Sequence, residues 1–156
     1  MQKSQTHNFE VFDASKYKIG IVCAHFNQDI TGQILDSALD KLNKFQVANE
    51  NIDIYHVAGS VEIPIILQSM AKTGQYQCLI AIGAIIRGET DHYNYVAKLV
   101  VEGINRVTLD HSLPIGFAVL TTGNKELAQA RVSIGAEAVQ ASLHNAQMLD
   151  KKAKMC

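Results

Sequence analysis

The sequence predicts an α/β fold, a three-layer α/β/α sandwich with a four-stranded parallel sheet. Four β-rich stretches are continuously apolar, as strands are when helices cover both faces of a parallel sheet. Between these stretches, apolar residues follow the i, i+3, i+4 spacing of helices. No linker, low-complexity run or repeat interrupts the alternation. Alternating strands and helices form right-handed crossovers, which produce this three-layer architecture.

The expected elements follow one another along the whole chain. Strands are predicted, in flavodoxin-like order, at residues 18–26 (KIGIVCAHF), 51–57 (NIDIYHV), 77–86 (QCLIAIGAII) and 114–122 (PIGFAVLTT). Helices are predicted at 29–45, 61–74 and 92–112, and the tail from Lys125 to about Lys152 is expected to be helical with a joint at Gly135. Pro64 near the start of the second helix and Gly74 just past its end are typical helix boundaries.

The first residues add little to this core. The segment NFEVF at 8–12 is a candidate short edge strand, and residues 1–15 are expected to form a partly flexible N-terminal arm. With 156 residues, the chain is expected to be a single domain, 1–156, that buries about 70% of its unfolded surface.

Composition limits the classes of function. Apolar residues make up 47% of the chain and the net charge is −1, so bulk charge does not indicate a nucleic-acid or acidic-membrane partner. The three cysteines are odd in number and form no C-x-x-C, which suits reduced thiols in the cytoplasm. The histidines show no paired spacing typical of a metal site. We find no apolar run typical of a signal peptide or a membrane span.

The most informative stretch is GAIIRGETDHYNYV at 83–96, where an apolar strand ends in polar groups. Its first half reads G-x-x-x-x-G-E-T, but a nucleotide-binding P-loop has lysine where this chain has Glu89, so we reject a nucleotide triphosphatase. A smaller anion site is still compatible, because Gly88 permits close backbone approach and the N–H groups that follow begin a helix. Thr90 would add a hydroxyl, and Arg87 a positive charge. The alternative is a plain glycine turn with Thr90 or Asp91 as helix cap.

His92 follows in the first turn of the predicted helix. An imidazole beside a bound phosphate ester can act as a general base and then as a general acid. A histidine at such a position can equally be structural or simply exposed.

These residues together carry a family resemblance. With HFN at 25–27, AGSVEIP at 58–64, FAVLTT at 117–122 and Arg131, the stretch at 83–96 resembles lumazine synthase over roughly residues 9–150. That resemblance implies a transferase that condenses 5-amino-6-(D-ribitylamino)uracil with 3,4-dihydroxy-2-butanone 4-phosphate to 6,7-dimethyl-8-ribityllumazine, the penultimate step of riboflavin synthesis. It implies no metal and no redox cofactor. It also implies a homopentamer with active sites between subunits, with riboflavin synthase as a candidate partner.

The resemblance assigns a role to each motif residue. Phe26 would stack on the pyrimidine, with Asn27 supporting its loop, and His92 would move protons. The ribityl pocket would be lined by Ser60, Val61 and Glu62, and the uracil edge would meet the backbone of Ala84, Ile85 and Ile86. Phosphate would meet Arg87, Gly88, Glu89 and Thr90. A neighbouring subunit would supply Phe117 as a wall and Arg131 as a phosphate ligand.

Taken singly, each of these residues also suits an ordinary structural role. Phe26 could be a core aromatic, Ser60 and Glu62 could cap a helix, and Phe117 could be strand interior. Arg131 could be a solvated helix residue. Their joint order and spacing favour the functional interpretation.

The chain departs from the family pattern after Arg131. The family has a loop of the type G-T-K-A-G-N-K-G there, whereas this chain continues with VSIGAEA, so that Ile134 replaces a phosphate-binding lysine. We expect weaker affinity for the butanone phosphate. We also expect a free pentamer or two stacked pentamers, since that loop lies where pentamers of the family meet in icosahedral shells.

Two other classes share parts of this pattern. A flavin- or lumazine-binding module without synthase activity would explain the lost lysine, but it needs neither His92 nor Arg131. A flavodoxin-type electron carrier needs a phosphate loop of Ser, Thr and Gly after the first strand, which AHFNQDITG does not supply.

Overall fold

The computed structural model describes residues 9–155 and contains one parallel sheet. Its strands are β1 (Ile19–Ala24), β2 (Ile52–Val57), β3 (Cys78–Ile86) and β4 (Ile115–Thr122). They lie in the order β2-β1-β3-β4 and every pair is parallel. The predicted four-stranded parallel sheet and its flavodoxin-like order are therefore confirmed.

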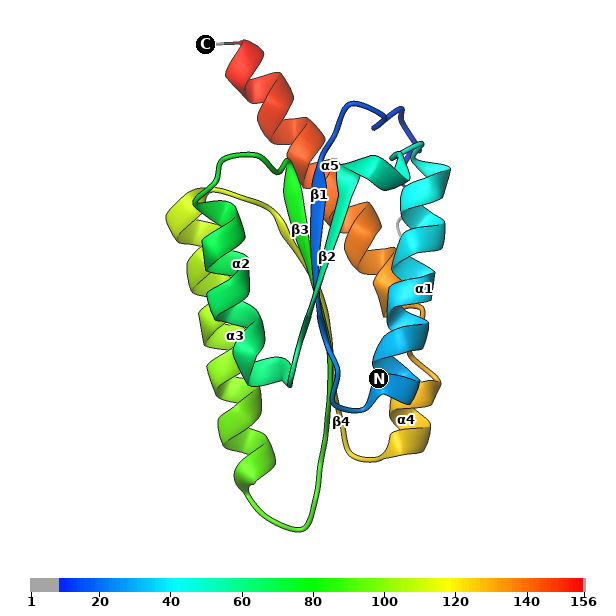
Figure 1. Ribbon diagram of the computed structural model, residues 1–156, viewed down its shortest axis with the longest axis vertical. Helices are drawn as coiled ribbons and strands as arrows, with labels where there is room; N and C mark the ends of the chain where they lie inside the picture. The colour runs from blue at the N-terminus through cyan, green and yellow to red at the C-terminus, as the bar shows by residue number, and fades with distance from the viewer. Residues whose placement is uncertain (1–8, 156) are drawn as a thin grey trace.

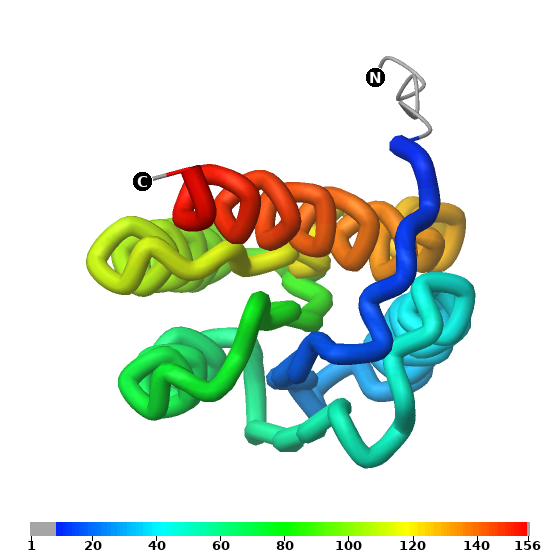
Figure 2. The backbone as a smooth tube through the Cα atoms, turned by 90° about the horizontal axis from the view of Figure 1, so that it is seen from above, coloured from blue at the N-terminus to red at the C-terminus, as the bar shows by residue number. Residues whose placement is uncertain are grey.

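Helices cover both faces of the sheet (Figure 1). On one face lie α1 (Gln28–Lys44) and α5 (Ile134–Lys154), with the short α4 (Lys125–Gln129) before α5. On the other lie α2 (Ile63–Ala71) and α3 (His92–His111). Two 3-10 turns, η1 (Asn49–Asn51) and η2 (Ser60–Glu62), flank β2. Seen from above, the strands run between these two helix layers (Figure 2).

Each helix layer encloses its own apolar cluster. Alternate residues of β3 point to opposite faces, so Ile80 and Ile82 join α1 and α5 while Leu79 and Ala81 join α2 and α3. All four side chains are fully buried. This two-sided burial is the reason that β3 reads as a continuous apolar run.

Strand β2 differs from that expectation. Its central residues are exposed, with Ile54 at 38% and Tyr55 at 51%. Within residues 9–155, β2 is an edge strand paired only with β1, and the side chains of Ile54, Tyr55 and His56 are left exposed. The prediction that helices cover both faces of every strand was therefore wrong for β2.

The candidate strand at 8–12 is also wrong where it is described, since residues 9–12 lie in no strand. The segment follows the helices instead: Phe9 stacks on His144 of α5, and Phe12 contacts Phe45 edge-on. The buried Ala14 then donates its N–H to the carbonyl of Phe45 at 2.9 Å. Side-chain packing on α1 and α5 thus replaces strand pairing in this segment. Residues 1–8 of the expected arm lie outside the described residues.

The helical tail breaks slightly before the predicted joint. Residues 130–133 form a turn, and Gly135 belongs to the first turn of α5. A Cβ on Gly135 would lie 2.1 Å from the carbonyl oxygen of Ile34. Gly135 therefore permits the close crossing of α5 over α1. From the sequence alone, a glycine needed for close helix packing could not be distinguished from a glycine at a helix break.

Candidate active site

A pocket of about 320 Å³ opens where the strands end at their carboxyl termini. Four chain segments meet there, as expected at this edge of a parallel sheet. The pocket is lined by Phe26 and Asn27 after β1, Gly59, Ser60, Val61 and Glu62 after β2, Ala84, Ile85, Ile86, Gly88 and Thr90 of β3 and its loop, and His92, Tyr93 and Val96 of α3.

The loop after β1 presents an aromatic ring at the pocket. The Phe26 side chain is 71% exposed, so it is no core aromatic. Its backbone N–H donates to the carbonyl of Ala58 at 3.0 Å. Next to it, Asn27 has left-handed backbone angles (φ 59°, ψ 44°), and its side-chain amide donates to the carbonyl of Ala84 at 2.8 Å. The ring thus stands on a loop that is attached to both neighbouring strands.

The loop after β2 forms the opposite wall. One carboxylate oxygen of Glu62 accepts the N–H of Gly59 at 2.9 Å, which is the capping role that the sequence left open. Glu62 and Val61 remain exposed toward the pocket, whereas Ser60 is buried beneath them. Capping therefore fixes the η2 turn without withdrawing Glu62 from the pocket wall.

Strand β3 forms the floor, and it is longer than its neighbour. β1 pairs with β3 only as far as Ile82, while β4 follows β3 to Ile86. In a strand, alternate residues present their backbone groups to the same edge. Arg87 donates to Thr122 on the β4 side and Ala84 accepts from Asn27 on the β1 side, so the backbone of Ile86 also faces the β1 side. The end of β3 thus offers an open strand edge to a ligand.

Two glycines of the motif have different roles. A Cβ on Gly83 would lie 2.4 Å from the Ser60 hydroxyl and 3.3 Å from the Ile63 side chain. On Gly88, by contrast, a Cβ would meet nothing within 4 Å. Within the protein, close packing therefore requires glycine at Gly83, whereas Gly88 leaves room at the pocket.

Only some residues of the predicted phosphate-binding segment, 87–92, line the pocket. Gly88, Thr90 and His92 line it, and the Thr90 hydroxyl accepts the N–H of His92 at 3.3 Å. Arg87 does not line it, and its guanidinium lies over the ring of Tyr93, 5.4 Å from the ring centre. Glu89 is exposed and also lies off the pocket wall. Phosphate contacts by Arg87 and Glu89 stay predictions.

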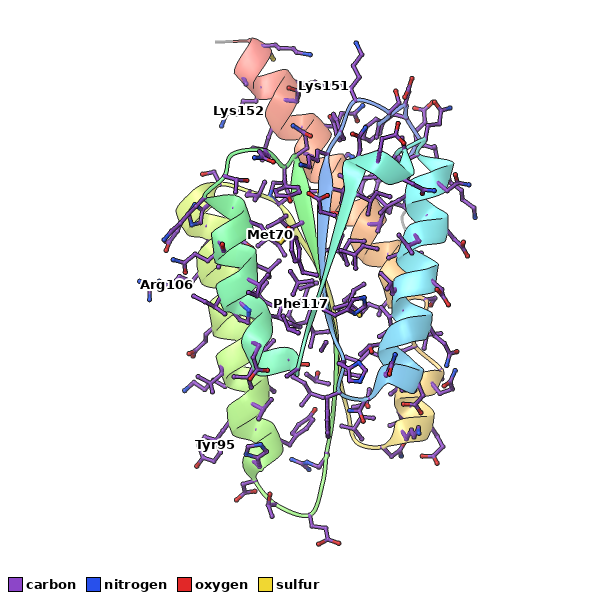
Figure 3. The ribbon with its side chains drawn as sticks, viewed as in Figure 1. Met70, Tyr95, Arg106, Phe117, Lys151 and Lys152 are labelled. Carbon is purple, nitrogen blue, oxygen red and sulfur yellow. The ribbon has the colours of Figure 1, made fainter. Side chains whose placement is uncertain are left out.

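Phe117 and Arg131 lie away from this chain's pocket. Phe117 is on the edge strand β4 opposite Ala81, well before the strand ends (Figure 3). Arg131 follows α4, and its guanidinium donates to the carbonyl of Leu127 at 2.9 Å. Both positions are compatible with the prediction that these residues serve a neighbouring subunit.

Comparison with known proteins identifies the family. The family model for 6,7-dimethyl-8-ribityllumazine synthase matches residues 16–150. The chain belongs to that family. It is 39% identical over 142 residues to a 6,7-dimethyl-8-ribityllumazine synthase of Protochlamydia amoebophila (strain UWE25), and the aligned residues make up 88% of this chain and 83% of the relative. Its identity to the synthases of Coxiella burnetii strains Dugway 5J108-111 and RSA 493 is 44% over 117 residues, 75% of this chain and 78% of each relative.

The resemblance inferred from the motifs is therefore confirmed, and so is the prediction of a riboflavin-biosynthesis transferase. The family names do not favour the alternative of a binding module. Ile134, where the resemblance leads us to expect a phosphate-binding lysine in the family, begins α5 and packs half-buried against the apolar cluster of α1 and α5.

The roles assigned from the resemblance did not cover every residue that lines the pocket. Gly59 of the loop after β2 lines it without an assigned role, as do Tyr93 and Val96, which follow His92 on one face of α3. Val96 also belongs to the apolar stripe of α3 that continues through Val100 and Ile104. That stripe extends into the first turns of α3, and the helical spacing from His92 was the available signal.

Two further observations concern metals and membranes. Within residues 9–155, no group of three or more His, Cys, Asp or Glu could hold a metal ion. In the same part of the chain, no helix is both long enough and apolar enough to cross a membrane.

Proposed function

We propose that this chain condenses 5-amino-6-(D-ribitylamino)uracil with 3,4-dihydroxy-2-butanone 4-phosphate, giving 6,7-dimethyl-8-ribityllumazine, phosphate and water. One observation carries the proposal: an exposed aromatic ring, an open strand edge and the start of a helix with His92 all meet in one pocket. These features correspond to the three parts of the reaction, a flat pyrimidine, its polar edge and a phosphate ester. The volume of about 320 Å³ lies at the lower end of small-molecule sites.

The pyrimidine would lie between Phe26 and the end of β3. The exposed ring of Phe26 offers a stacking face, which is worth about 1–3 kcal/mol for a planar base. The backbone at the end of β3 would read the uracil edge as a neighbouring strand reads a partner. Ile86 faces the open edge, whereas the Ala84 carbonyl is taken by Asn27 and Ile85 faces β4. The ribityl chain would then run along Ser60, Val61 and Glu62, whose carboxylate can accept from hydroxyls.

The phosphate would lie at the N-terminus of α3. That helix has 20 residues and begins at His92, so its first N–H groups and dipole favour an anion there. Gly88 leaves room for close approach, and Thr90 contributes a hydroxyl.

The reaction follows from holding both substrates there. The 5-amino group attacks the ketone and water leaves, which forms an imine. Phosphate is then eliminated, the enol tautomerises to a second carbonyl, and the ribitylamino nitrogen closes the ring with loss of water. Orientation of the two reactants can supply about 7–11 kcal/mol of the barrier. His92, at the pocket wall, would carry protons between these steps and contribute about 100-fold or more.

We also propose a homopentamer whose sites lie between subunits. The predicted partners Phe117 and Arg131 are remote from the chain's own pocket, which fits a contribution to a neighbour. Exposed apolar side chains support such contacts: Ile54 and Tyr55 on β2, and Tyr95, Leu99 and Leu109 on α3. A cytoplasmic location is proposed as well, because the buried Cys23 and Cys78 are free thiols, which suits a reducing compartment.

The test is direct. Purified protein is mixed with both substrates, and the lumazine is followed by absorbance and fluorescence beside the spontaneous reaction. Formation well above that background supports the synthase; tight pyrimidine binding without acceleration would establish the binding module instead.

Site sharing has its own experiment. Phe26→Ala and Arg131→Ala proteins are assayed separately and after unfolding and refolding together. If the two residues serve one site from different subunits, random mixing restores about a quarter of the sites. Mixtures no more active than the separate variants would reject a shared site.

A further inference from the structure

The short helix α4 is held in place only weakly by apolar burial. Of its five described residues, Ala128 alone has a buried side chain. Burial of an alanine contributes little, because its side chain is a single methyl group. A helix of this length is also unstable in water by itself. The place of α4 on the protein therefore depends strongly on its polar side chains.

One face of α1 supplies partners for these side chains. Asp29, Gln33 and Ser37 are spaced four residues apart, so they form one row along that helix. The Asp29 carboxylate forms an ion pair with Lys125 at the start of α4. The Ser37 hydroxyl accepts the N–H of Ala136, in the first turn of α5, at 3.1 Å. The row thus reaches from α4 to the start of α5, and both helices lie beside α1 in Figure 1.

The central contact of this row is a reciprocal pair of amides. Gln33 Nε2 donates to Gln129 Oε1 at 3.0 Å, and Gln129 Nε2 donates to Gln33 Oε1 at 2.6 Å. The Gln33 amide also donates to the backbone carbonyl of Asp29 at 2.7 Å, which fixes its side chain on α1. The ion pair of Asp29 joins two exposed groups and contributes little by itself. The amide pair is therefore the main polar contact between α1 and α4.

Arg131 directly follows α4 and is attached to it. Its backbone N–H donates to the carbonyl of Ala128 at 3.0 Å, and its guanidinium donates to the carbonyl of Leu127 at 2.9 Å. The Arg131 carbonyl accepts the N–H of Ile134, at the start of α5, at 3.0 Å. A shift of α4 would therefore displace the Arg131 guanidinium.

We propose that Gln33 and Gln129 are positioning residues, whose amide pair holds α4 against α1 and thereby sets where Arg131 is presented to the neighbouring subunit. This inference rests on the proposed function and extends it, because the motifs gave neither glutamine a role. The pair acts on phosphate binding and not on the pyrimidine, since Gln129 and Arg131 lie outside the pocket wall.

Removing either glutamine tests the pair. Gln33→Ala and Gln129→Ala each abolish both amide bonds, and alanine is well tolerated in a helix. Each is expected to raise the Michaelis constant of the butanone phosphate about fivefold and to leave that of the pyrimidine within about twofold. The double variant should be no worse than either single variant, because both changes remove the same pair. A wild-type constant for the butanone phosphate, or losses that add in the double variant, would overturn the proposal.

Gln75→Ala is the matched control. The side-chain carbonyl of Gln75 accepts from the Lys18 ammonium group at 3.0 Å, and this bond also joins segments far apart in the chain. Gln75 precedes β3 and Lys18 precedes β1, so the bond lies at the opposite end of the sheet from the pocket. Both constants should stay unchanged. An increase for the butanone phosphate equal to that of Gln129→Ala would overturn the proposal, because the effect would then be global.

Combination with Arg131→Ala tests the route of the effect. If the glutamines act through Arg131, Gln129→Ala adds no further loss once the guanidinium is absent. A full further loss would show that Gln129 acts in another way and would overturn the proposal. An Arg131→Ala protein with the wild-type constant for the butanone phosphate would overturn it as well.

Hydrogen exchange gives a readout without substrate. The amides of residues 127–131 should exchange faster in both glutamine variants and not in Gln75→Ala; unchanged exchange would contradict the proposal. If the wild-type protein forms no lumazine, the proposed function fails. The affinity for inorganic phosphate, measured by calorimetry on the same variants, then decides the role of the glutamines: weaker binding supports it and unchanged binding overturns it.

Discussion

Gly83 is the position at which a single methyl group should most directly disturb the pocket. The Gly83→Ala change places a Cβ 2.4 Å from the Ser60 hydroxyl, whereas ordinary van der Waals contact begins at 3.4 Å. About 1 Å of overlap must therefore be relieved. β3 is held in the sheet by its pairing with β4 at Val119, so the Ser60 hydroxyl must rotate away or the η2 turn that carries Ser60 must shift.

Two effects of known size follow from that displacement. Overpacking of a buried site costs about 1–3 kcal/mol of the free energy of unfolding. The η2 turn also carries Val61 and Glu62 of the pocket wall, so part of the same energy is lost from pyrimidine binding. We expect the Michaelis constant of the pyrimidine to rise about tenfold, which corresponds to roughly 1.4 kcal/mol. The constant for the butanone phosphate should change by less than about twofold.

The assay pairs kinetics with thermal or urea unfolding and uses Gly20→Ala as control. A Cβ on Gly20, near the start of β1 and so at the opposite end of the sheet from the pocket, would lie 2.2 Å from the Met70 side chain and 2.7 Å from that of Leu79. Gly20→Ala should destabilise the protein without changing either Michaelis constant. A destabilised Gly83→Ala protein with the wild-type pyrimidine constant would refute the reasoning, because Ser60 would then have moved without affecting the site.

Three further predictions address catalysis and stability. His92→Gln should lower kcat about 100-fold with little change in either Michaelis constant, as measured from the rate of lumazine formation at saturating substrates. An unchanged kcat would show that His92 does not transfer protons in the reaction. Tyr76→Phe removes the 2.5 Å bond to Asp53 and should cost about 1 kcal/mol at pH 7 by urea unfolding. That bond, aided by Lys18, lowers the pKa of Asp53 below 3.8, so its stabilisation is present above that pH and is lost as the pH falls through the folded-state pKa. A wild-type–variant difference that does not narrow at low pH would contradict this assignment. Gly32→Ala, on α1 with nothing within 4 Å of its Cβ, should stabilise by about 0.5–1 kcal/mol, and a loss of stability would show a contact not seen here.

The sequence alone determined the sheet and the family. Continuous apolar runs such as that of β3 depend on burial of every residue, which is a local property of a central strand, so their positions could be predicted closely. The motif at 83–96 was equally local, and its order with Phe26, Glu62 and Arg131 identified the lumazine synthase family.

Only the tertiary structure decided how these residues meet. That β3 continues past β1, that Asn27 caps its open edge, and that Gly83 and not Gly88 packs tightly all depend on pairing register and loop contacts between segments far apart in the chain. The same holds for Phe9 and Phe12, whose β-rich pattern packs on helices instead of pairing. Such contacts depend on which apolar surfaces are still uncovered once the sheet has formed. The hydrophobic periodicity of a single segment does not show which other segment will cover it.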